Sequence, residues 1–267
     1  MFHLSAQPLV IDSYKNPKYT YDVNVMGTVN VCECVRLSNS VRSFVNVTTD
    51  KVYENIEDKN HYYKEDEKLN GYDPYSNSKS CSELVTQSYI KSFFKEKGIA
   101  VSTCRAGNVI GGGDFADNRI IPDCVRATID NKTIKVRNPN SYRPYQHVLE
   151  ADMFYLLLAE KQYEDINYAG HYNIGPNDED CISTKELVEL FALNWPGARY
   201  ECINVSWPHE ANFLKLDSSK GKKILNWNPK YNIKMAVRTT TEWYKGYNND
   251  DDLIDLTNIQ IFNYLEK

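Results

Sequence analysis

The sequence has 267 residues, of which 42% are hydrophobic, so it can bury a large core and is expected to be globular, with one large domain or a domain and a smaller lobe. Its 36 acidic and 31 basic residues give a formal net charge of -5, which offers no positive field for a nucleic-acid partner. No stretch approaches the roughly 18 apolar residues of a membrane span. Met1–Leu4 lacks the charged and apolar regions of a signal peptide, so we expect a cytoplasmic protein without a membrane partner.

The cysteine pattern argues against disulfides and against a metal site. Seven cysteines are an odd number, and no Cys-x-x-Cys pair occurs among them. We therefore expect reduced thiols and no bound metal. Cys81 and Cys104 are expected to be core residues.

Predicted helices and strands alternate over the first two thirds of the chain, which indicates a parallel sheet with helices on both faces. Apolar residues at helical spacing predict a helix over 22–37, and a short apolar run predicts a buried strand over 43–47. The next helix is expected over 75–97, with Asp73 as its cap and Gly98 at its end. Later in this region we expect strands at 99–104 and 170–174, and helices at 119–129 and 149–161.

The pattern weakens after about residue 174. Short surface helices are predicted there, and the acidic run 250–252 is expected to be a solvated joint before a last amphipathic stretch. The three surface helices are expected at 184–193, 218–225 and 233–247.

Tyr75 and Lys79 stand four residues apart on the predicted helix and so share one face. The Lys79 ammonium would stabilise the Tyr75 phenolate and lower a pKa that is ordinarily near 10. Tyr75 is therefore a candidate general base for an alcohol, and Thr49, beyond the strand 43–47, could hydrogen-bond the same oxygen. The alternative is an ordinary surface helix, because this spacing arises by chance in a chain with 20 tyrosines.

Asp50 and Lys51 follow Thr49 directly and add an acid and a base to the proton relay. A simple dehydrogenase needs only the relay, whereas an acid and a base together suit an elimination. The alternative is that the pair forms a solvated turn at the end of a strand.

These residues resemble the Ser/Thr and Tyr-x-x-x-Lys centre of the short-chain dehydrogenase/reductase superfamily. Longer motifs resemble the CDP-glucose 4,6-dehydratases, sugar-nucleotide enzymes of its extended branch. Relatives that act on dTDP-glucose carry Asp-Glu after the Thr, whereas this branch carries Asp-Lys, so Lys51 favours a CDP-sugar. The motifs are His3–Gln7, Asn24–Thr28, Arg105–Phe115, Arg119–Asp123, Arg137–Pro139, Arg143–Glu150, Asn173–Pro176, Asp217–Lys220 and Leu225–Pro229.

The resemblance implies an NAD-dependent lyase that converts CDP-D-glucose to CDP-4-keto-6-deoxy-D-glucose for deoxysugar synthesis. Tyr75 would take the O4 proton, Lys51 would take the C5 proton, and Asp50 would protonate the departing C6 hydroxyl. It also implies a homodimer through the helices 75–97 and 22–37. The implied catalytic residues are Thr49, Asp50, Lys51, Tyr75 and Lys79; those for NAD are Ala6, Gln7, Asn24, Thr48, Tyr75 and Lys79; those for the substrate are Asn108, Arg119, Arg137, Arg143 and Asn173.

Family members begin with a βαβαβ half that carries a glycine-rich fingerprint for the cofactor pyrophosphate, and this sequence begins after it. We therefore expect an incomplete doubly wound, Rossmann-like α/β sheet in 1–173 and a smaller substrate-binding lobe in 174–267, to which parts of 106–150 contribute. Three explanations would account for the missing βαβαβ half: the sequence is a fragment, its start was assigned downstream of the true start, or the gene is broken. Two alternatives to the dehydratase remain: a non-catalytic remnant that binds CDP-sugar or a full-length partner, and another NAD-dependent epimerase or dehydratase.

Overall fold

The computed structural model describes residues 1–203 and 213–267, which divide into two compact units. Sequence order suggests one boundary near residue 174, whereas the units interleave along the chain. The first unit comprises Met1–Gly107, Met153–Ile174 and Leu214–Asn228. The second comprises Asn108–Asp152, Gly175–Phe213 and Pro229–Lys267.

A parallel sheet forms the centre of the first unit. Its described strands lie in the order β1-β2-β3-β8, and every neighbouring pair is parallel. This topology confirms the predicted α/β, Rossmann-like class. The strands are β1 (Phe2–His3), β2 (Ser43–Val47), β3 (Ala100–Ala106) and β8 (His171–Ile174).

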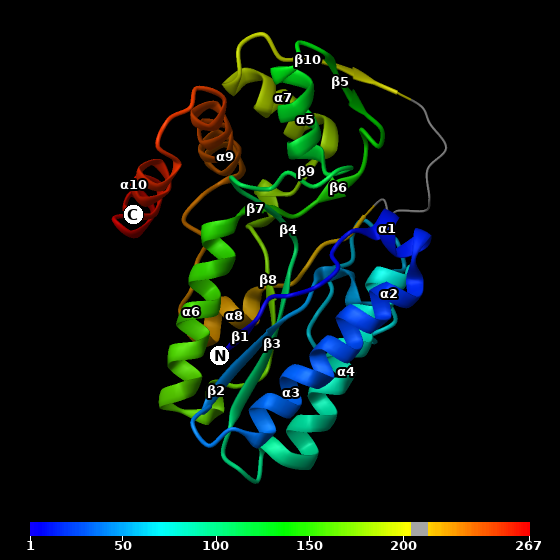
Figure 1. Cartoon of the computed structure of the whole chain (residues 1–267), viewed down its shortest axis with the longest axis vertical. Helices are drawn as coiled ribbons and strands as arrows, with labels where there is room; N and C mark the ends of the chain where they lie inside the picture. Colours follow the sequence, from blue (N-terminus) through cyan, green and yellow to red (C-terminus); the bar gives the residue numbers. More distant parts are fainter. Residues whose placement is uncertain (204–212) are drawn as a thin grey trace. The chain divides into compact units, whose positions relative to one another are not determined.

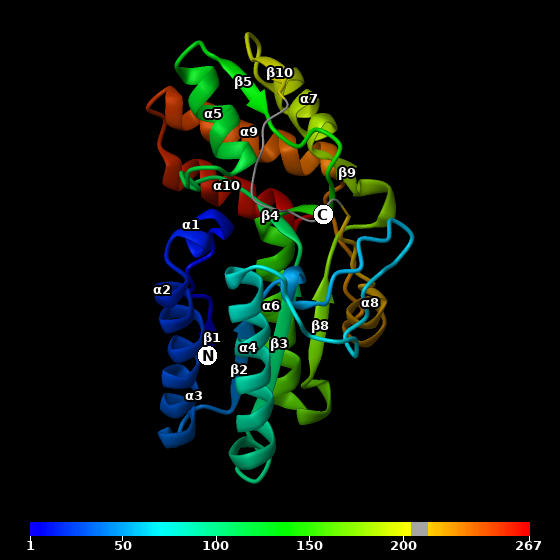
Figure 2. The same cartoon turned by 90° about the vertical axis from the view of Figure 1, so that its right-hand side faces the viewer.

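Helices cover both faces of this sheet, with α3 and α4 on one side and α6 and α8 on the other (Figures 1 and 2). Successive side chains of a strand point to opposite faces. Phe44 accordingly packs with Cys32 of α3, while the hydroxyl of Ser43 donates to the carbonyl of Ala159 in α6. The helices are α1 (Val10–Lys15), α2 (Pro17–Tyr21), α3 (Gly27–Leu37), α4 (Pro74–Tyr89), α6 (Val148–Glu164) and α8 (Ser219–Leu225), with π-helical turns η1 (Asp22–Met26) before α3 and η3 (Ile90–Phe94) after α4.

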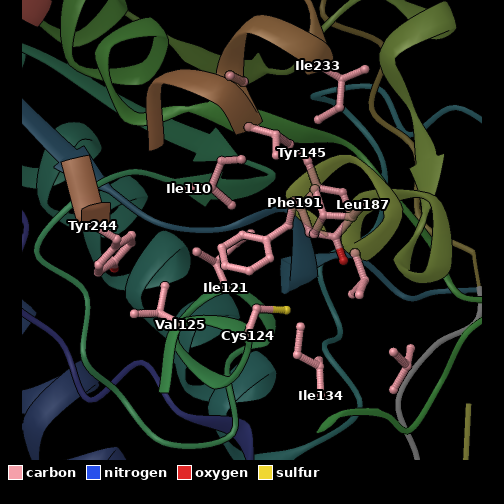
Figure 3. Packing of buried hydrophobic residues seen from close by; sticks show 14 residues of the cluster. Ile110, Ile121, Cys124, Val125, Ile134, Tyr145, Leu187, Phe191, Ile233 and Tyr244 are labelled. Carbon is pink, nitrogen blue, oxygen red and sulfur yellow. The ribbon is translucent and has the colours of Figure 1, made fainter. Parts of the chain in front are cut away.

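The second unit has a hydrophobic core of its own, in which Figure 3 shows Phe191 and Leu187 of α7 with Ile121 of α5. The helices predicted at 184–193 and 233–247 form as α7 and α9, and each has one apolar face that fills this core. The helices are α5 (Ile120–Ile129), α7 (Thr184–Asn194), α9 (Ile233–Asn248) and α10 (Leu253–Leu265). The strands pair as β4 (Asn108–Ile110) with β7 (Tyr145–His147), β5 (Thr133–Val136) with β10 (Arg199–Cys202), and β6 (Tyr142–Arg143) with β9 (Ile182–Ser183).

The cysteines form no disulfide in the part of the chain that the structure describes. Cys104 is buried as predicted, whereas Cys81 is only half-buried, beside the partly exposed Asn77 of α4. Within the same described residues, no group of three or more His, Cys, Asp or Glu side chains could hold a metal ion. No helix there is both long enough and apolar enough to cross a bilayer.

Two glycine substitutions test the packing. A Cβ at Gly112 would overlap the indole of Trp243, whereas one at Gly27, in helical backbone, would meet nothing within 4 Å. We expect Gly112→Ala to lower the free energy of unfolding by about 1–3 kcal/mol through overpacking. Gly27→Ala should raise it by about 0.5–1 kcal/mol. Urea unfolding measures both, and a Gly112→Ala variant as stable as the unmodified protein would contradict the packing on α9.

Candidate active site

The end of β2 carries the first group of candidate catalytic residues. Beyond Val47 the chain continues in extended conformation through Thr49 into the 3₁₀ turn η2 (Asp50–Val52). The Thr49 hydroxyl donates to Asp50 Oδ1 at 2.9 Å and accepts from the Lys51 backbone N–H at 3.4 Å. Parallel α/β sheets bind ligands outside the carboxyl ends of their strands, so these side chains stand where a site is expected.

Asp50 and Lys51 form an ion pair, with 3.2 Å between Lys51 Nζ and Asp50 Oδ1. The Asp50 side chain is fully buried, while that of Lys51 is 27% exposed. A solvated turn therefore does not describe this pair. Asp50 Oδ2 has no hydrogen-bond partner among the described residues. Because a buried oxygen without a donor is costly, this atom is a ready acceptor for a hydroxyl of a bound ligand.

Helix α4 places Tyr75, Lys79 and Glu83 one turn apart on one face. Tyr75 is 8% exposed and Lys79 is 5% exposed, so the alternative of an ordinary surface helix is wrong. Lys79 Nζ donates to the carbonyl of Val47 at 3.0 Å. This bond joins α4 to the end of β2, and α4 packs against η2.

The Lys79 ammonium is held in a poorly solvated place. Burial lowers the pKa of Lys79 to about 8, and the negative charge of Glu83 opposes that shift. Of its three N–H donors, one is bound to the carbonyl of Val47. A lysine with a strongly perturbed pKa beside a tyrosine is a marker of functional sites.

The side chains predicted to contact NAD are largely engaged within the protein. Asn24 pairs with the backbone of Gln7: its Oδ1 accepts from the N–H at 2.7 Å and its Nδ2 donates to the carbonyl at 3.1 Å. Thr48 donates to Glu83 Oε1 at 2.6 Å. Ala6 precedes Gln7 and is half-buried. These bonds hold neighbouring segments of the chain together, whether or not Gln7, Asn24 and Thr48 also contact NAD.

The arginines predicted to bind the substrate belong to the second unit. Arg119, at the start of α5, pairs with Asp114 at 2.9 Å and keeps 40% of its side chain exposed. Arg137 pairs with Asp123 at 2.9 Å. Arg143 in β6 is buried, and its Nη1 donates to the carbonyl of Tyr142. A diphosphate would therefore have to displace aspartates from Arg119 and Arg137.

The two predicted asparagines differ in what they offer a ligand. Asn108 Oδ1, in β4, is buried and has no hydrogen-bond partner among the described residues. Asn173, in β8, is fully buried, and its Oδ1 accepts from the Tyr53 hydroxyl at 2.6 Å. Its Nδ2 donates to the carbonyls of Tyr63 and Asp217 at 2.7 and 3.2 Å. The amide of Asn173 is thus used within the first unit and does not present itself to a substrate.

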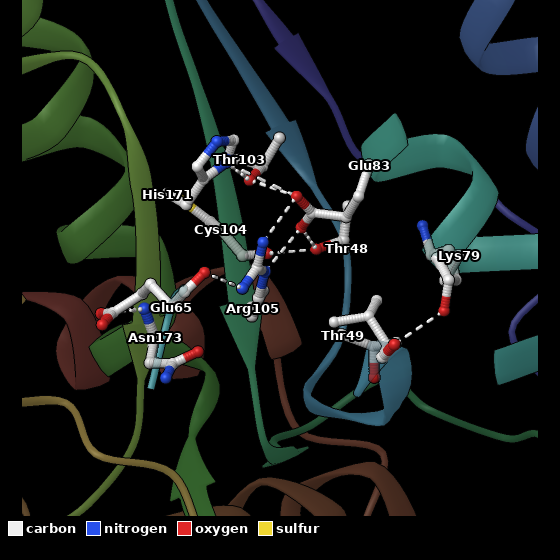
Figure 4. A network of polar contacts seen from close by, with 12 residues as sticks. Thr48, Thr49, Glu65, Lys79, Glu83, Thr103, Cys104, Arg105, His171 and Asn173 are labelled. Carbon is white, nitrogen blue, oxygen red and sulfur yellow. Dashed lines mark hydrogen bonds and ion pairs between the residues drawn. The ribbon is translucent and has the colours of Figure 1, made fainter. Parts of the chain in front are cut away.

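A buried ion pair between Glu83 and Arg105 lies beside Thr48 and Tyr53, and no sequence pattern predicted it. Figure 4 shows the guanidinium of Arg105 against the carboxylate of Glu83, with Nε–Oε1 at 2.9 Å and Nη2–Oε2 at 3.0 Å. Burial alone would raise the pKa of Glu83, but His171, whose Nδ1 lies 3.6 Å from Oε2, and the paired Arg105 hold it below its usual range. The four-residue spacing from Lys79 is the sequence signal that could have identified Glu83.

The parallel sheet, with Tyr75 and Lys79 on α4 beside the end of β2, defines a protein of the extended short-chain dehydrogenase/reductase class. Within that class, residues 1–240 match the family described as GDP-mannose 4,6 dehydratase, and the chain belongs to this family. This confirms the resemblance to nucleotide-sugar dehydratases.

Two curated relatives show the range of similar proteins. The chain is 39% identical to the CDP-glucose 4,6-dehydratase of Salmonella typhimurium, over 99% of this chain and 76% of that protein. It is 28% identical to a trifunctional UDP-glucose 4,6-dehydratase, epimerase and reductase of Arabidopsis thaliana, over 91% of this chain and 36% of that protein.

Solved structures share the fold at lower identity. The dTDP-glucose 4,6-dehydratase DesIV of Streptomyces venezuelae, solved with NAD bound, superposes with a TM-score of 0.79 at 22% identity, over 94% of this chain and 74% of that one. The UDP-glucuronic acid 4-epimerase of Bacillus cereus, also with NAD, gives 0.79 at 19% identity, over 92% and 74% of the two chains.

Lys79→Met tests the buried charge. In the unfolded chain the lysine pKa is about 10.5 and in the folded chain it is about 8, so the charge opposes folding fully below pH 8 and less as pH rises toward 10.5. We expect the free energy of unfolding of Lys79→Met to be about 1–3 kcal/mol higher than that of the unmodified protein at pH 7. The gain should shrink between pH 8 and 10.

Urea unfolding at pH 7 and pH 9.5 measures this difference, and the exposed Lys59→Met serves as control, with no change at either pH. A difference for Lys79→Met that does not depend on pH would contradict the buried ammonium.

Proposed function

We propose that this chain acts as a CDP-D-glucose 4,6-dehydratase, a lyase that forms CDP-4-keto-6-deoxy-D-glucose with NAD as its cofactor. The observation that carries the proposal is the ion pair between buried Asp50 and partly exposed Lys51, beside the α4 face of Tyr75 and Lys79. An alcohol dehydrogenase needs a proton relay alone, whereas loss of water needs a further acid and base. The 39% identity with a CDP-glucose 4,6-dehydratase supports the choice of nucleotide.

The residues present fit the reacting end of NAD. The Lys79 ammonium has N–H donors beyond the one bound to Val47, at a strand end where ligands bind, and Tyr75 stands one turn before it. Tyr75, Lys79 and the two segments that contain Ala6 and Thr48 would hold the nicotinamide ribose. When bound, NAD supplies the reversible oxidation that makes the sugar ready for elimination. A glycine-rich turn for the pyrophosphate is not among residues 1–267.

Tyr75 acts on the O4 hydroxyl of the sugar. The positive charge of Lys79, one helical turn away, favours the phenolate, and the phenolate removes the O4 proton. Thr49 hydrogen-bonds the same oxygen and orients it. Once C4 is a carbonyl, the proton on the neighbouring C5 becomes acidic.

Asp50 and Lys51 then carry out the elimination with balanced protons. Neutral Lys51 removes the C5 proton, and protonated Asp50 gives its proton to the C6 hydroxyl, which leaves as water. The pair ends as Lys51 ammonium and Asp50 carboxylate, which is the ion pair that the structure contains. The Lys51 ammonium returns a proton to C5 as C6 takes up the hydride that NAD would supply, and the Asp50 carboxylate takes a proton from solvent, which restores the acid and the base.

The CDP moiety is assigned to the second unit. Arg119, partly exposed, can exchange Asp114 for a phosphate oxygen, and Arg137 can do the same with Asp123. Arg143 adds charge, and the buried Oδ1 of Asn108 offers an acceptor to a hydroxyl or an amino group. Asn173 is left out of this set because its amide is already satisfied.

Substitution of the acid and the base tests the proposal. Asp50→Asn and Lys51→Met should each lower the rate of 4-keto product formation from CDP-glucose by about 10²–10⁴-fold, because each removes one proton transfer. The exposed Lys59→Met is the control and should leave the rate unchanged. The assay follows the product by chromatography with NAD and CDP-glucose in excess. An unmodified protein that forms no 4-keto product would contradict the proposed function.

The assembly we propose is a homodimer through the helices 22–37 and 75–97. Exposed apolar side chains on these helices support it, among them Met26, Phe93 and Leu84, which is 52% exposed. We expect sedimentation to give a dimer, and Leu84→Glu should dissociate it through buried charge at the interface. Leu193→Glu, at a 79% exposed leucine on α7, is the matched control and should remain dimeric. A monomeric unmodified protein would overturn this assembly.

A further inference from the structure

The turn that bears Asp50 and Lys51 is fixed at its beginning by Glu83. Thr48, the residue before Thr49, donates its hydroxyl to Glu83 Oε1 at 2.6 Å. The backbone N–H of Thr48 separately donates to the carbonyl of Cys104 at 2.8 Å. The backbone bond therefore sets Thr48 in the sheet. The hydroxyl bonds more closely to Glu83 on α4 than to the same Cys104 carbonyl, from which it lies 3.2 Å.

The same turn is fixed at its end by Arg105. Tyr53 follows η2 directly, and Arg105 Nη1 donates to its hydroxyl at 2.8 Å. The guanidinium also lies over the Tyr53 ring, 5.0 Å from the centroid, and the hydroxyl in turn donates to Asn173. The cation paired with Glu83 thus supplies two of the contacts that hold Tyr53, beside the bond to Asn173, the stacked ring of Tyr63 and a backbone bridge to Leu69.

The burial of this ion pair needs a reason other than stability. Arg105 is 1% exposed and Glu83 is not exposed at all. A buried ion pair contributes little net stability compared with apolar residues of the same volume, because both charges must leave water. Its bonds are directional, however, and each partner makes one of them to a residue that flanks the turn. The pair therefore fixes the geometry of residues 49–52.

We propose that the Glu83–Arg105 ion pair is a positioning device that clamps both ends of the turn 49–52, so that Asp50 and Lys51 stay in register with Tyr75 and Lys79 on α4. The inference rests on the proposed function for what the turn does. Glu83 and Arg105 themselves touch no reacting atom in this scheme. They act through Thr48 and Tyr53.

Two threonines that donate to the same carboxylate provide a matched test. Thr103, in β3, donates to Glu83 Oε2 at 2.7 Å, and its strand end carries none of the proposed acid and base groups. Thr48→Val and Thr103→Val each remove one buried hydroxyl from Glu83, so they should lose similar stability. Only Thr48→Val should lower kcat, by about tenfold, with KM within about twofold, and Thr48→Ser should restore kcat.

Hydrogen exchange provides a readout that does not depend on turnover. The amides of residues 50–53 should exchange faster in Thr48→Val than in the unmodified protein, and should be unchanged in Thr103→Val. Tyr53→Phe should give the same local increase, with Tyr172→Phe, a buried tyrosine bonded to the carbonyl of Tyr168, as its control.

The outcomes separate the two ideas. If the amides of residues 50–53 exchange at the same rate in Thr48→Val and Thr103→Val, the proposal of a clamp is wrong, whether or not the protein is a dehydratase. If kcat falls equally in both, or Thr48→Ser does not restore it, the positioning role is wrong while dehydration stands. If exchange follows the expectation but the unmodified protein forms no 4-keto product, the clamp exists, the proposed function fails, and the positioning role fails with it.

Discussion

One face of helix α4 buries a phenol, an ammonium and a carboxylate at successive turns, and the first unit is arranged around that constraint. None of these groups can leave water cheaply without partners. The strand ends supply these partners. Lys79 donates to the carbonyl of Val47, and Glu83 pairs with Arg105 and accepts from the hydroxyl of Thr48. The helix is thereby locked to the segment that carries the proposed acid and base.

The charges on this face depend on one another. Glu83 lies between Lys79 on its own helix and Arg105 on β3, and its negative charge favours the charged form of both. Burial pulls the pKa of Lys79 down while Glu83 holds it up, so the ammonium stays near its titration point. An ammonium in that state favours the neighbouring phenolate without being locked permanently in the charged form. The contacts of Lys79, Glu83 and Arg105 therefore contribute both to folding and to the proposed chemistry.

The sequence predicted local elements well and tertiary partnerships poorly. The helices 22–37 and 75–97 and the strand 43–47 follow from apolar spacing and helix caps, which are local signals. Tyr75 and Lys79 are also local, because they share one helix. Arg105 is 22 residues from Glu83 and meets it only when β3 packs beneath α4, so no short-range pattern announces the pair.

The same limit explains the differences found at single residues. The apolar faces of α7 and α9 meet only in the folded second unit, so the sequence did not predict which core they fill. An asparagine is a common ligand-binding residue, but the amide of Asn173 is already hydrogen-bonded to the Tyr53 hydroxyl and to two backbone carbonyls. Asp114 and Asp123 neutralise arginines that look available in the sequence.

The proposed acid Asp50 and base Lys51 at the end of β2 would remove water across C5 and C6 of a nucleotide sugar. Conversion of CDP-glucose in ²H₂O, followed by NMR, tests this elimination. We expect a 4-keto product with a methyl group at C6 and deuterium from solvent at C5. A product that keeps its C6 hydroxyl and carries no deuterium at C5, as simple epimerisation at C4 would give, would contradict it.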